Sequence, residues 1–244
     1  MAALASALVF ALLPPTATAA DVVMAFGEKI PPFCIPETNS GIELEVIGEA
    51  LAHKGHKLKP VYVPFARIPL AFKDKSVDAA MTDLGEDMRP FGGHYGDPAV
   101  FYDNVFISLQ ARNLRIEKPA DLQGLTLVSF RGAANRYPEW LQGLKQAGGY
   151  TELNDQAAQV KTLMRRRYDV VLSDRNIFKY FSLQLKRSGF PMEPVQEHRF
   201  TEVKPQDYRP IFRDPQVRDD FNLGLKQLKA SGRFQAIYDK YLRE

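Results

Sequence analysis

Short apolar runs alternate with segments of helical periodicity in the first part of this chain, and that alternation constrains its fold more than any single motif. In chain order, the pattern predicts a strand, a helix, a strand, a helix and a strand at 22–26, 41–53, 58–63, 68–75 and 77–82. Such alternation favours a parallel sheet with helical crossovers. Ligands of these sheets bind beyond the carboxyl ends of the strands, so we expect binding residues in the loops 27–33, 64–67 and 82–89.

The alternation restarts after a turn at 121–124. It predicts strands at 125–130, 151–153 and 169–173, and helices at 132–144, 156–167, 176–186 and 214–242. We therefore expect an α/β fold of two lobes, each a sheet flanked by helices. The first lobe would comprise residues 21–109 and 196–244, and the second, residues 110–195, would be inserted into it. The chain would then cross between the lobes twice, which is a two-strand hinge.

The first twenty residues differ from the rest of the chain because they carry no charge. An apolar run from Leu4 to Leu13 is followed by small residues, and Ala17-Thr18-Ala19 fits a cleavage site. Residues 1–20 are thus predicted to be a signal peptide that is cut before Ala20 or Asp21, although it lacks the usual basic start. Neither this run nor any later one has the roughly 20 apolar residues of a spanning helix. We expect a mature protein that is exported to the periplasm and does not span the membrane.

The charge distribution is not that of a nucleic-acid-binding protein. With 32 basic and 29 acidic residues among 244, the formal net charge is only +3. The basic residues are scattered except for Arg165 to Arg167, which we interpret as a solvated helix face.

The sequence offers no metal-ligand pattern. Cys34 is the single cysteine, so no intramolecular disulfide can form, and we interpret it as a small buried residue. The four histidines are scattered, at positions 53, 56, 94 and 198. His53 and His56 are three residues apart, but no third ligand lies near them in sequence. We therefore expect neither a metal nor a cofactor.

Four segments resemble motifs of one protein family in the order in which that family has them. They are Ile30-Pro31-Pro32-Phe33, Val77-Asp78-Ala79-Ala80 with Arg89, 121–127 with Gly132, and 232–241 (GRFQAIYDKY). By their order and spacing, the chain resembles the family 3 extracellular solute-binding proteins, the periplasmic components of polar amino-acid uptake systems. The resemblance covers the whole mature chain. It implies the type 2 periplasmic-binding-protein fold, a small-molecule ligand and the membrane subunits of an ABC transporter as partners. We expect a monomer.

The resemblance also implies ligand-binding residues. Arg89 matches the arginine that clamps the ligand carboxylate, for which a planar fork of donors is suited. Asp174 matches the carboxylate that takes the ligand's α-ammonium, and its position also suits the N-cap of the following helix. Phe33 and Phe65 match aromatic residues that wall the cleft.

A further implied contact is the start of the helix that follows the second lobe's first strand. There Gly132, Ala134 and Asn135 would present free backbone N–H groups to an anionic part of the ligand. In the family a threonine pair stands where this chain has Ala133 and Ala134. This loss predicts weak binding of standard α-amino acids.

Other departures alter the expected charge of the site. Small hydroxyl residues of the family become Thr82, Asp83 and Gly85, so only one hydroxyl remains and Asp83 adds an acid. Arg67 and Arg131 could supply positive charge, although Arg67 could equally pack its stem on the lobe surface. The ligand could therefore be a different zwitterion or another charged metabolite.

Two other functions remain open at this point. A few proteins of this superfamily resemble cyclohexadienyl dehydratases, whose elimination reaction needs a general acid. The candidate donors are Glu28, Asp83, His94 and Asp174, but the sequence has no G-x-S-x-G, H-E-x-x-H or P-loop motif, and we expect no catalysis. A sensory protein that reports its closed form to a membrane receptor would have the same fold.

Overall fold

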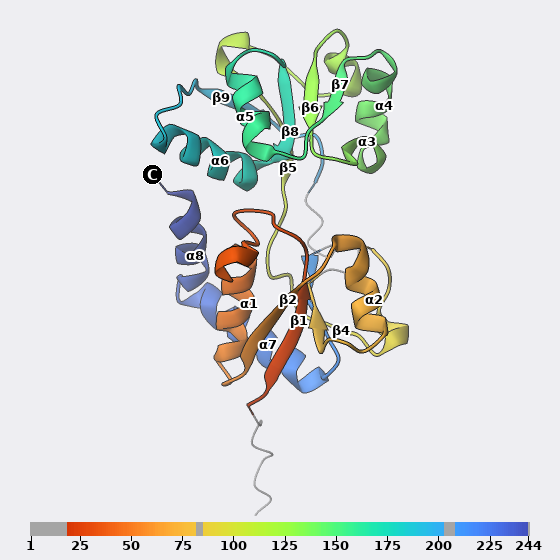
Figure 1. Cartoon of the computed structure of the whole chain (residues 1–244), viewed down its shortest axis with the longest axis vertical. Coiled ribbons are helices and arrows are strands. Elements are labelled where there is room, and N and C mark those ends of the chain that lie inside the picture. The colour runs from red at the N-terminus through yellow and green to blue at the C-terminus, as the bar shows by residue number, and fades with distance from the viewer. Residues whose placement is uncertain (1–18, 82–84, 203–207, 244) are drawn as a thin grey trace, which may run out of the picture.

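In a computed structural model, which describes residues 19–81, 85–202 and 208–243, the chain folds into two lobes, each built on one five-stranded sheet (Figure 1). Across the first sheet, the strands are β2 (Lys57–Tyr62), β1 (Asp21–Phe26), β3 (Ala79–Ala80), β10 (Ile211–Phe212) and β4 (His94–Tyr95). Across the second, they are β7 (Tyr150–Glu152), β6 (Leu127–Ser129), β8 (Val170–Asp174), β5 (Asn104–Leu109) and β9 (Val195–His198). Two sheets with helices on their faces confirm the predicted two-lobed α/β fold.

The first lobe covers both faces of its sheet. Its helices are α1 (Ile42–Ala52), α2 (Ile68–Lys73), α7 (Pro215–Ala230) and α8 (Arg233–Leu242). Strand β1 is buried on both sides: Met24 and Phe26 belong to the core with α1 and α7, while Ala25 shares the other core with Phe72 of α2. This explains why the strand reads as a continuous apolar run. Strands β1, β2 and β3 are parallel, and β10 is antiparallel to its neighbours.

The second lobe has the same layered construction. Its helices are α3 (Ala133–Arg136), α4 (Pro138–Gln146), α5 (Gln156–Met164) and α6 (Arg175–Arg187). Alternate residues of β5 face opposite cores: Val105 and Ile107 pack with residues of α5 and α6, and Phe106 packs with residues of α3 and α4. Strands β6, β7 and β8 are parallel, whereas β5 is antiparallel to β8 and β9.

Two of the predicted helices are each broken in two. The helix predicted at 132–144 is interrupted at Tyr137, because Pro138 opens α4 and disfavours helical geometry in the residue before it. The helix predicted at 214–242 ends at Ala230, and Gly232 adopts a left-handed φ of 77° before α8 begins.

The positions at which the chain changes lobe also differ from expectation. We expected the first lobe to extend to residue 109, but β5 pairs with β8 and β9, so its residues lie in the second sheet. The chain therefore leaves the first sheet after β4 and returns to it between β9 and β10.

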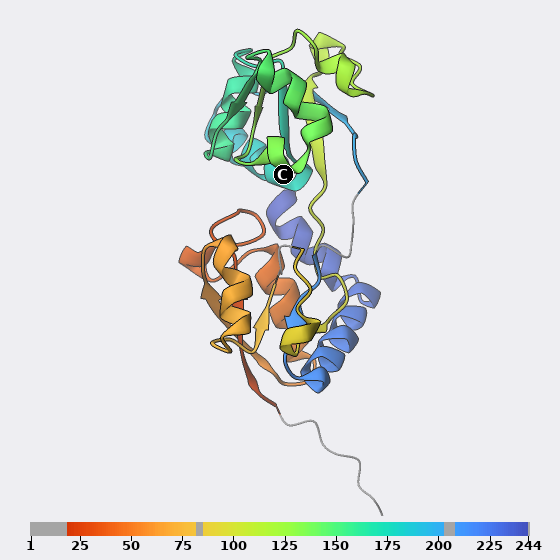
Figure 2. The same ribbon diagram turned by 90° about the vertical axis from the view of Figure 1, so that its right-hand side faces the viewer.

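Helix α8 extends from the first lobe toward the second. Figures 1 and 2 show the lobes end to end, with α8 beside α6, and the two helices are in contact. The guanidinium of Arg187, at the end of α6, donates to the backbone carbonyl of Arg243 over 2.9 Å. Within the described ranges, no helix combines the length and apolar character needed to cross a bilayer.

Close packing between α1 and α7 generates a prediction about stability. A Cβ added at Gly224 would lie 1.9 Å from the carbonyl oxygen of Ala50, which is backbone and cannot rotate away. Gly224→Ala should therefore lower the free energy of unfolding by about 1–3 kcal/mol. Gly143→Ala, in the exposed interior of α4 with open space around the glycine, should instead raise it by about 0.5–1 kcal/mol. Urea unfolding of both variants checks this, and equal effects would contradict the packing described.

Candidate functional site

A cleft of about 330 Å³ lies between the two lobes. The first lobe lines it with Ile30, Glu43, Phe65 and Met81, the second with Asn104, Phe130, Arg136, Gln156, Ser173, Asp174 and Ile177, and the connecting stretches with Tyr102 and Tyr208. Several of these residues lie at or just beyond the carboxyl ends of β3, β6 and β8, where parallel sheets bind ligands. The volume and the mixture of apolar walls with a few polar groups suit a small ligand.

Asp174 is the best-anchored polar group of this cleft. It ends β8 and caps α6, since one carboxylate oxygen accepts from the backbone N–H groups of Asn176 and Ile177, both at 2.9 Å. The other oxygen accepts from the backbone N–H of Asp103 over 2.6 Å. The residue is only 2% exposed, so its position is fixed by the fold. The two expected roles, helix cap and cleft carboxylate, are therefore combined in one side chain.

The electrostatics of Asp174 follow from this burial. Desolvation raises the pKa of its carboxyl from 3.8 to about 7, with a further upward contribution from the Asp103 charge, while the three backbone N–H groups act in the opposite direction. A cation bound beside it would favour the ionised form.

Aromatic rings form one wall of the cleft. Tyr102 packs against Phe33 with ring centroids 4.2 Å apart, and against Tyr208 at 5.1 Å. Phe33 is fully buried behind Tyr102, so it supports the wall, and Tyr102 is the ring that lines the cleft. Phe65 does line the cleft, as expected, and is 36% exposed.

Glu43 is a cleft residue that the sequence analysis missed. It lies in the first turn of α1 and is 5% exposed, and burial raises the pKa of its carboxyl to about 8. Its backbone N–H donates to the carbonyl of Phe33 over 3.0 Å. Preceding it, Gly41 has a φ of 124°, and a Cβ there would lie 2.3 Å from the same carbonyl oxygen, so the approach requires glycine. The Gly41 N–H donates to the hydroxyl of Tyr241 in α8, which fixes the start of the helix.

The sequence did contain a signal for Glu43. Val46, Ile47 and Ala50 follow it by three, four and seven residues, and that spacing puts the acid on the apolar face of a helix. A charged residue in a buried stripe is unusual without a partner. Ser173 and Arg136, in contrast, were each one residue from a predicted site residue.

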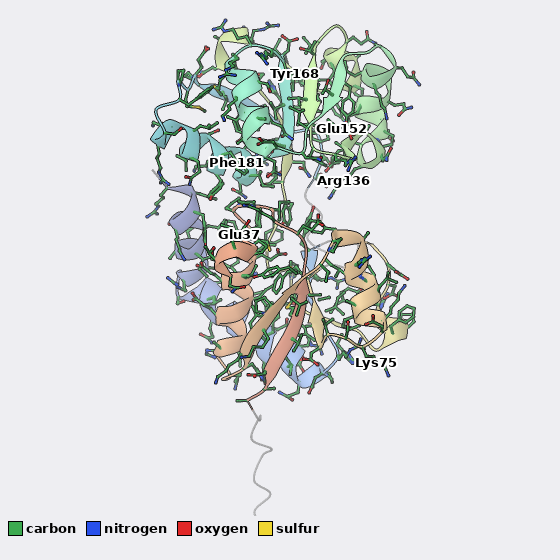
Figure 3. The ribbon with its side chains drawn as sticks, in the orientation of Figure 1. Glu37, Lys75, Arg136, Glu152, Tyr168 and Phe181 are labelled. Carbon is green, nitrogen blue, oxygen red and sulfur yellow. The ribbon has the colours of Figure 1, made fainter. Side chains whose placement is uncertain are left out.

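Arg136 is the cationic side chain that lines the cleft within the part of the chain that the structure describes. It ends α3, and its guanidinium donates to the hydroxyl of Tyr208 over 2.8 Å. Figure 3 shows Arg136 on the side of the second lobe that faces the first. The neighbouring Tyr137 hydroxyl accepts from the side-chain amide of Asn104 over 2.9 Å, which orders that edge of the cleft.

The structure does not bring the predicted arginines into the cleft. Arg89 follows the loop after β3, and its guanidinium makes three hydrogen bonds to the carboxylate of Asp87, the shortest at 2.9 Å. Its side chain is 74% exposed. Arg67 and Arg131 are also exposed and do not line the cleft. Local pairing with an acid two residues away thus accounts for the orientation of Arg89.

The predicted backbone anion site is filled by the protein itself. The N–H of Ala133 donates to Phe130 O, that of Ala134 to the hydroxyl of Tyr150, and that of Asn135 to the carbonyl of Gly132. These groups are therefore not free for a ligand.

Two predicted site residues, Thr82 and Asp83, lie outside the described residues. Of the other candidate acids and bases, Glu28 is exposed and His94 lies in β4, and neither lines the cleft. Cys34 is buried, as interpreted, with its thiol 3.6 Å from the carbonyl oxygen of Gly27. Over the described ranges, no three His, Cys, Asp or Glu side chains are grouped so that they could hold a metal ion.

The two-lobed architecture agrees with comparisons to known proteins. Residues 22–244 match the family described as bacterial extracellular solute-binding proteins, family 3. The chain belongs to this family. No curated protein matches it by sequence.

Solved structures of similar fold place this family 3 protein among type 2 periplasmic-binding-protein structures, as predicted. Substrate binding domain 2 of GlnP from Lactococcus lactis, in its open conformation, is 21% identical, with a TM-score of 0.65 over 95% of this chain and 98% of that one. A histidine-bound ABC uptake transporter substrate-binding protein from Streptococcus pneumoniae is 16% identical, with a TM-score of 0.64 over 92% and 93%. An ancestral cationic amino acid solute-binding protein is 18% identical, with a TM-score of 0.67 over 92% and 96%. At sequence identities this low, the structural similarity shows that the fold is shared.

The burial of Glu43 generates a prediction about pH. Its pKa is about 8 in the folded chain and near the ordinary value of 4.5 when unfolded, so the folded state binds the extra proton between these values. Stability of the ligand-free protein should therefore fall as pH rises from about 5 to 8. Glu43→Gln removes the contribution of this carboxyl to the pH dependence of stability. The variant should therefore be more stable than wild type at pH 8, with a smaller difference at pH 5.

Thermal melting at pH 5, 7 and 8 measures the effect. Glu49→Gln is the control, because Glu49 lies on the same helix but its carboxylate is paired with Arg233 at 2.6 Å. The control should keep the pH trend of wild type. A Glu43→Gln variant with the same trend as wild type would show that Glu43 is not the buried acid described.

Proposed function

We propose that this family 3 protein binds a small polar or charged, amino-acid-like solute in the periplasm and delivers it to the membrane subunits of an ABC-type uptake system. The observation that carries the proposal is the Asp174 carboxylate, which is held at the end of β8 in a cleft between two lobes. Among the similar structures, the histidine-bound substrate-binding protein of an ABC uptake transporter supports the amino-acid and ABC-transporter parts.

The ligand's ammonium group would bind Asp174. This carboxylate already accepts three backbone hydrogen bonds, and an ionised carboxylate has the capacity to accept another from a ligand in the cleft that it lines. The Tyr102 and Phe65 rings would cover the apolar part of the ligand.

We infer that Arg136 holds the ligand's carboxylate. A guanidinium fork suits a carboxylate, and Arg136 lines the cleft while Arg89 is turned toward Asp87. The Tyr208 hydroxyl, which accepts from Arg136 over 2.8 Å, would orient that fork.

Binding would act by closing the lobes. The proposed contacts come from both lobes and from the connecting stretches, so a ligand would bind the closed arrangement better and shift the population toward it. Because β5 and β9 belong to the second sheet, we propose a first lobe of about 21–95 with 211–244 and a second of about 104–198, in place of the predicted division at 109/110 and 195/196. We place the hinge in the stretch 96–103 and, among the described residues of the return connection, in 199–202 and 208–210, between the strands of the two sheets.

A second candidate function is an elimination reaction in the same cleft. The observation that favours it is that burial raises the pKa of two cleft carboxyls, to about 7 for Asp174 and about 8 for Glu43. Acids with such values hold a proton near neutral pH and suit general acid catalysis. Incubation of the protein with prephenate-like compounds, followed by analysis of the products, separates this function from binding alone.

Binding by variants tests the ligand contacts. The first step is a thermal-shift screen of wild type with amino acids, polyamines and organic acids, because a ligand of the folded state raises the melting temperature. For a zwitterionic ligand, Asp174→Asn and Arg136→Ala should each cost about 2–5 kcal/mol of binding free energy, measured by calorimetry.

Arg89→Ala is the matched comparison for Arg136→Ala. We expect it to bind as wild type does, because its guanidinium is paired with Asp87 on the surface. A loss in Arg89→Ala with none in Arg136→Ala would reverse the assignment. An analogue that lacks the amine provides a second control, since Asp174→Asn should hardly change its affinity if the variant is folded.

A further inference from the structure

Glu43 is a buried acid in the cleft for which the fold provides no counter-charge among the described residues. It is 5% exposed and lines the cleft, yet its carboxylate has neither a hydrogen bond nor an ion pair in the part of the chain that the structure describes. The other acids of α1 behave differently: Glu45 pairs with Lys240 at 2.6 Å, and Glu49 with Arg233. A buried carboxyl group without a hydrogen-bond partner is costly even when it is protonated, so such a group is better explained by a ligand than by folding.

A purely structural role does not explain why Glu43 is buried and lines the cleft. An acid in the first turn of a helix interacts favourably with the helix dipole, but that interaction works equally well at an exposed position. The N-cap of α1 is Gly41, and no side chain caps the helix. Nothing in the helix start therefore requires the carboxylate to face the cleft.

Glu43 and Asp174 share one neighbourhood although they come from different lobes. Burial raises the pKa of Tyr102, and the charges of Glu43 and Asp174 raise it further. The same causes raise the pKa of Tyr238 in α8, against a backbone hydrogen bond from Phe101 that lowers it. The charges of both carboxylates thus act on both hydroxyls, and Tyr102 lines the cleft together with Glu43 and Asp174.

Among the described residues, Glu43, unlike Glu45 and Glu49, forms no ion pair with a lysine, arginine or histidine. Besides the two tyrosines, its charge acts on Cys34, whose pKa burial raises to about 12. Arg136, the cation in the described lining, donates instead to the Tyr208 hydroxyl. The described lining of the cleft thus holds two acids and one guanidinium, an excess of one negative charge when both acids are ionised.

We propose that Glu43 and Asp174 form two cation subsites in one cleft, so that the ligand carries two cationic groups, each an ammonium or a guanidinium. The inference rests on the proposed binding function and narrows its ligand class. A basic amino acid would fill both subsites and place its carboxylate on Arg136. A diamine would fill both subsites and leave Arg136 with Tyr208. A basic amino acid and a diamine both carry two cationic groups, and the experiment below distinguishes them.

Matched ligands test the second cation. Arginine has two cationic groups and a carboxylate, citrulline replaces the guanidinium by a neutral group of the same shape, and agmatine lacks the carboxylate. Lysine, norleucine and cadaverine form a parallel set of different length. In calorimetric titrations of wild type at pH 7, arginine should bind roughly 10- to 100-fold more tightly than citrulline, or lysine than norleucine. In Glu43→Gln this preference should shrink to about threefold or less, and in Glu49→Gln it should persist.

Proton release provides a second readout that does not depend on affinity alone. With a pKa of about 8, Glu43 is mostly protonated at pH 7, and a bound cation should expel that proton. Titration in two buffers of different ionisation enthalpy should show wild type releasing up to one proton more than Glu43→Gln. Circular dichroism establishes that the variant is folded.

Each outcome bears on one claim. If wild type binds citrulline or norleucine as tightly as the dications, or if Glu43→Gln retains the full preference, the second subsite is refuted while the binding function stands. If neither these compounds nor the wider screen raises the melting temperature of wild type, the proposed binding function fails as well. Tight binding of arginine or lysine with weak binding of agmatine and cadaverine identifies the amino-acid source, and the reverse identifies the diamine.

Discussion

Three backbone N–H groups converge on the carboxylate of Asp174, and the geometry of the cleft depends on this junction. Two of the donors open α6, and the third belongs to Asp103 in the stretch that enters the second lobe. One side chain therefore joins the end of β8, the start of α6 and the connection between the lobes. Because the hydrogen bonds hold it in place, the same carboxylate can stay buried in the cleft and accept a ligand without moving.

In the first lobe, close backbone packing and a hydrogen bond likewise position the residue that lines the cleft. The loop after β1 and the start of α1 are tied together by Gly41, whose left-handed backbone allows close approach to Phe33, and by the Tyr241 hydroxyl from α8. This arrangement aims Glu43 at the cleft while its neighbours in α1 pair with α8. The two lobes thus each contribute a buried acid to the cleft, and Tyr102, which packs against Phe33 and Tyr208, lines the cleft with them.

Much of the fold could be predicted because apolar periodicity reports directly on buried strands and helices. Strand β1 and helix α1 were predicted to within a residue or so. The two-residue strands β4 and β10 were missed, because so short a strand has no periodicity and exists only through pairing across the sheet. For the same reason, the positions where the chain changes lobe were not visible in the sequence.

The candidate site was less predictable than the fold. Asp174 could be placed because it follows a strand and precedes a helix, which fixes where the side chain lies. Arg89 could not, because the competing contact with Asp87 depends on the loop geometry. The sequence does show that Glu43 lies on the apolar face of a helix. Whether this acid binds a ligand, however, depends on which residues the second lobe places across the cleft from it.

Small-angle X-ray scattering tests the central claim, that a ligand held between Asp174 and the first lobe closes the two lobes. The radius of gyration would be measured for wild type and for Asp174→Asn, each without ligand and with the tightest-binding compound at saturation. The account predicts that the ligand lowers the radius of gyration of wild type, and that Asp174→Asn needs far more ligand to reach the same value. An unchanged radius in wild type under conditions where calorimetry shows full occupancy would contradict it.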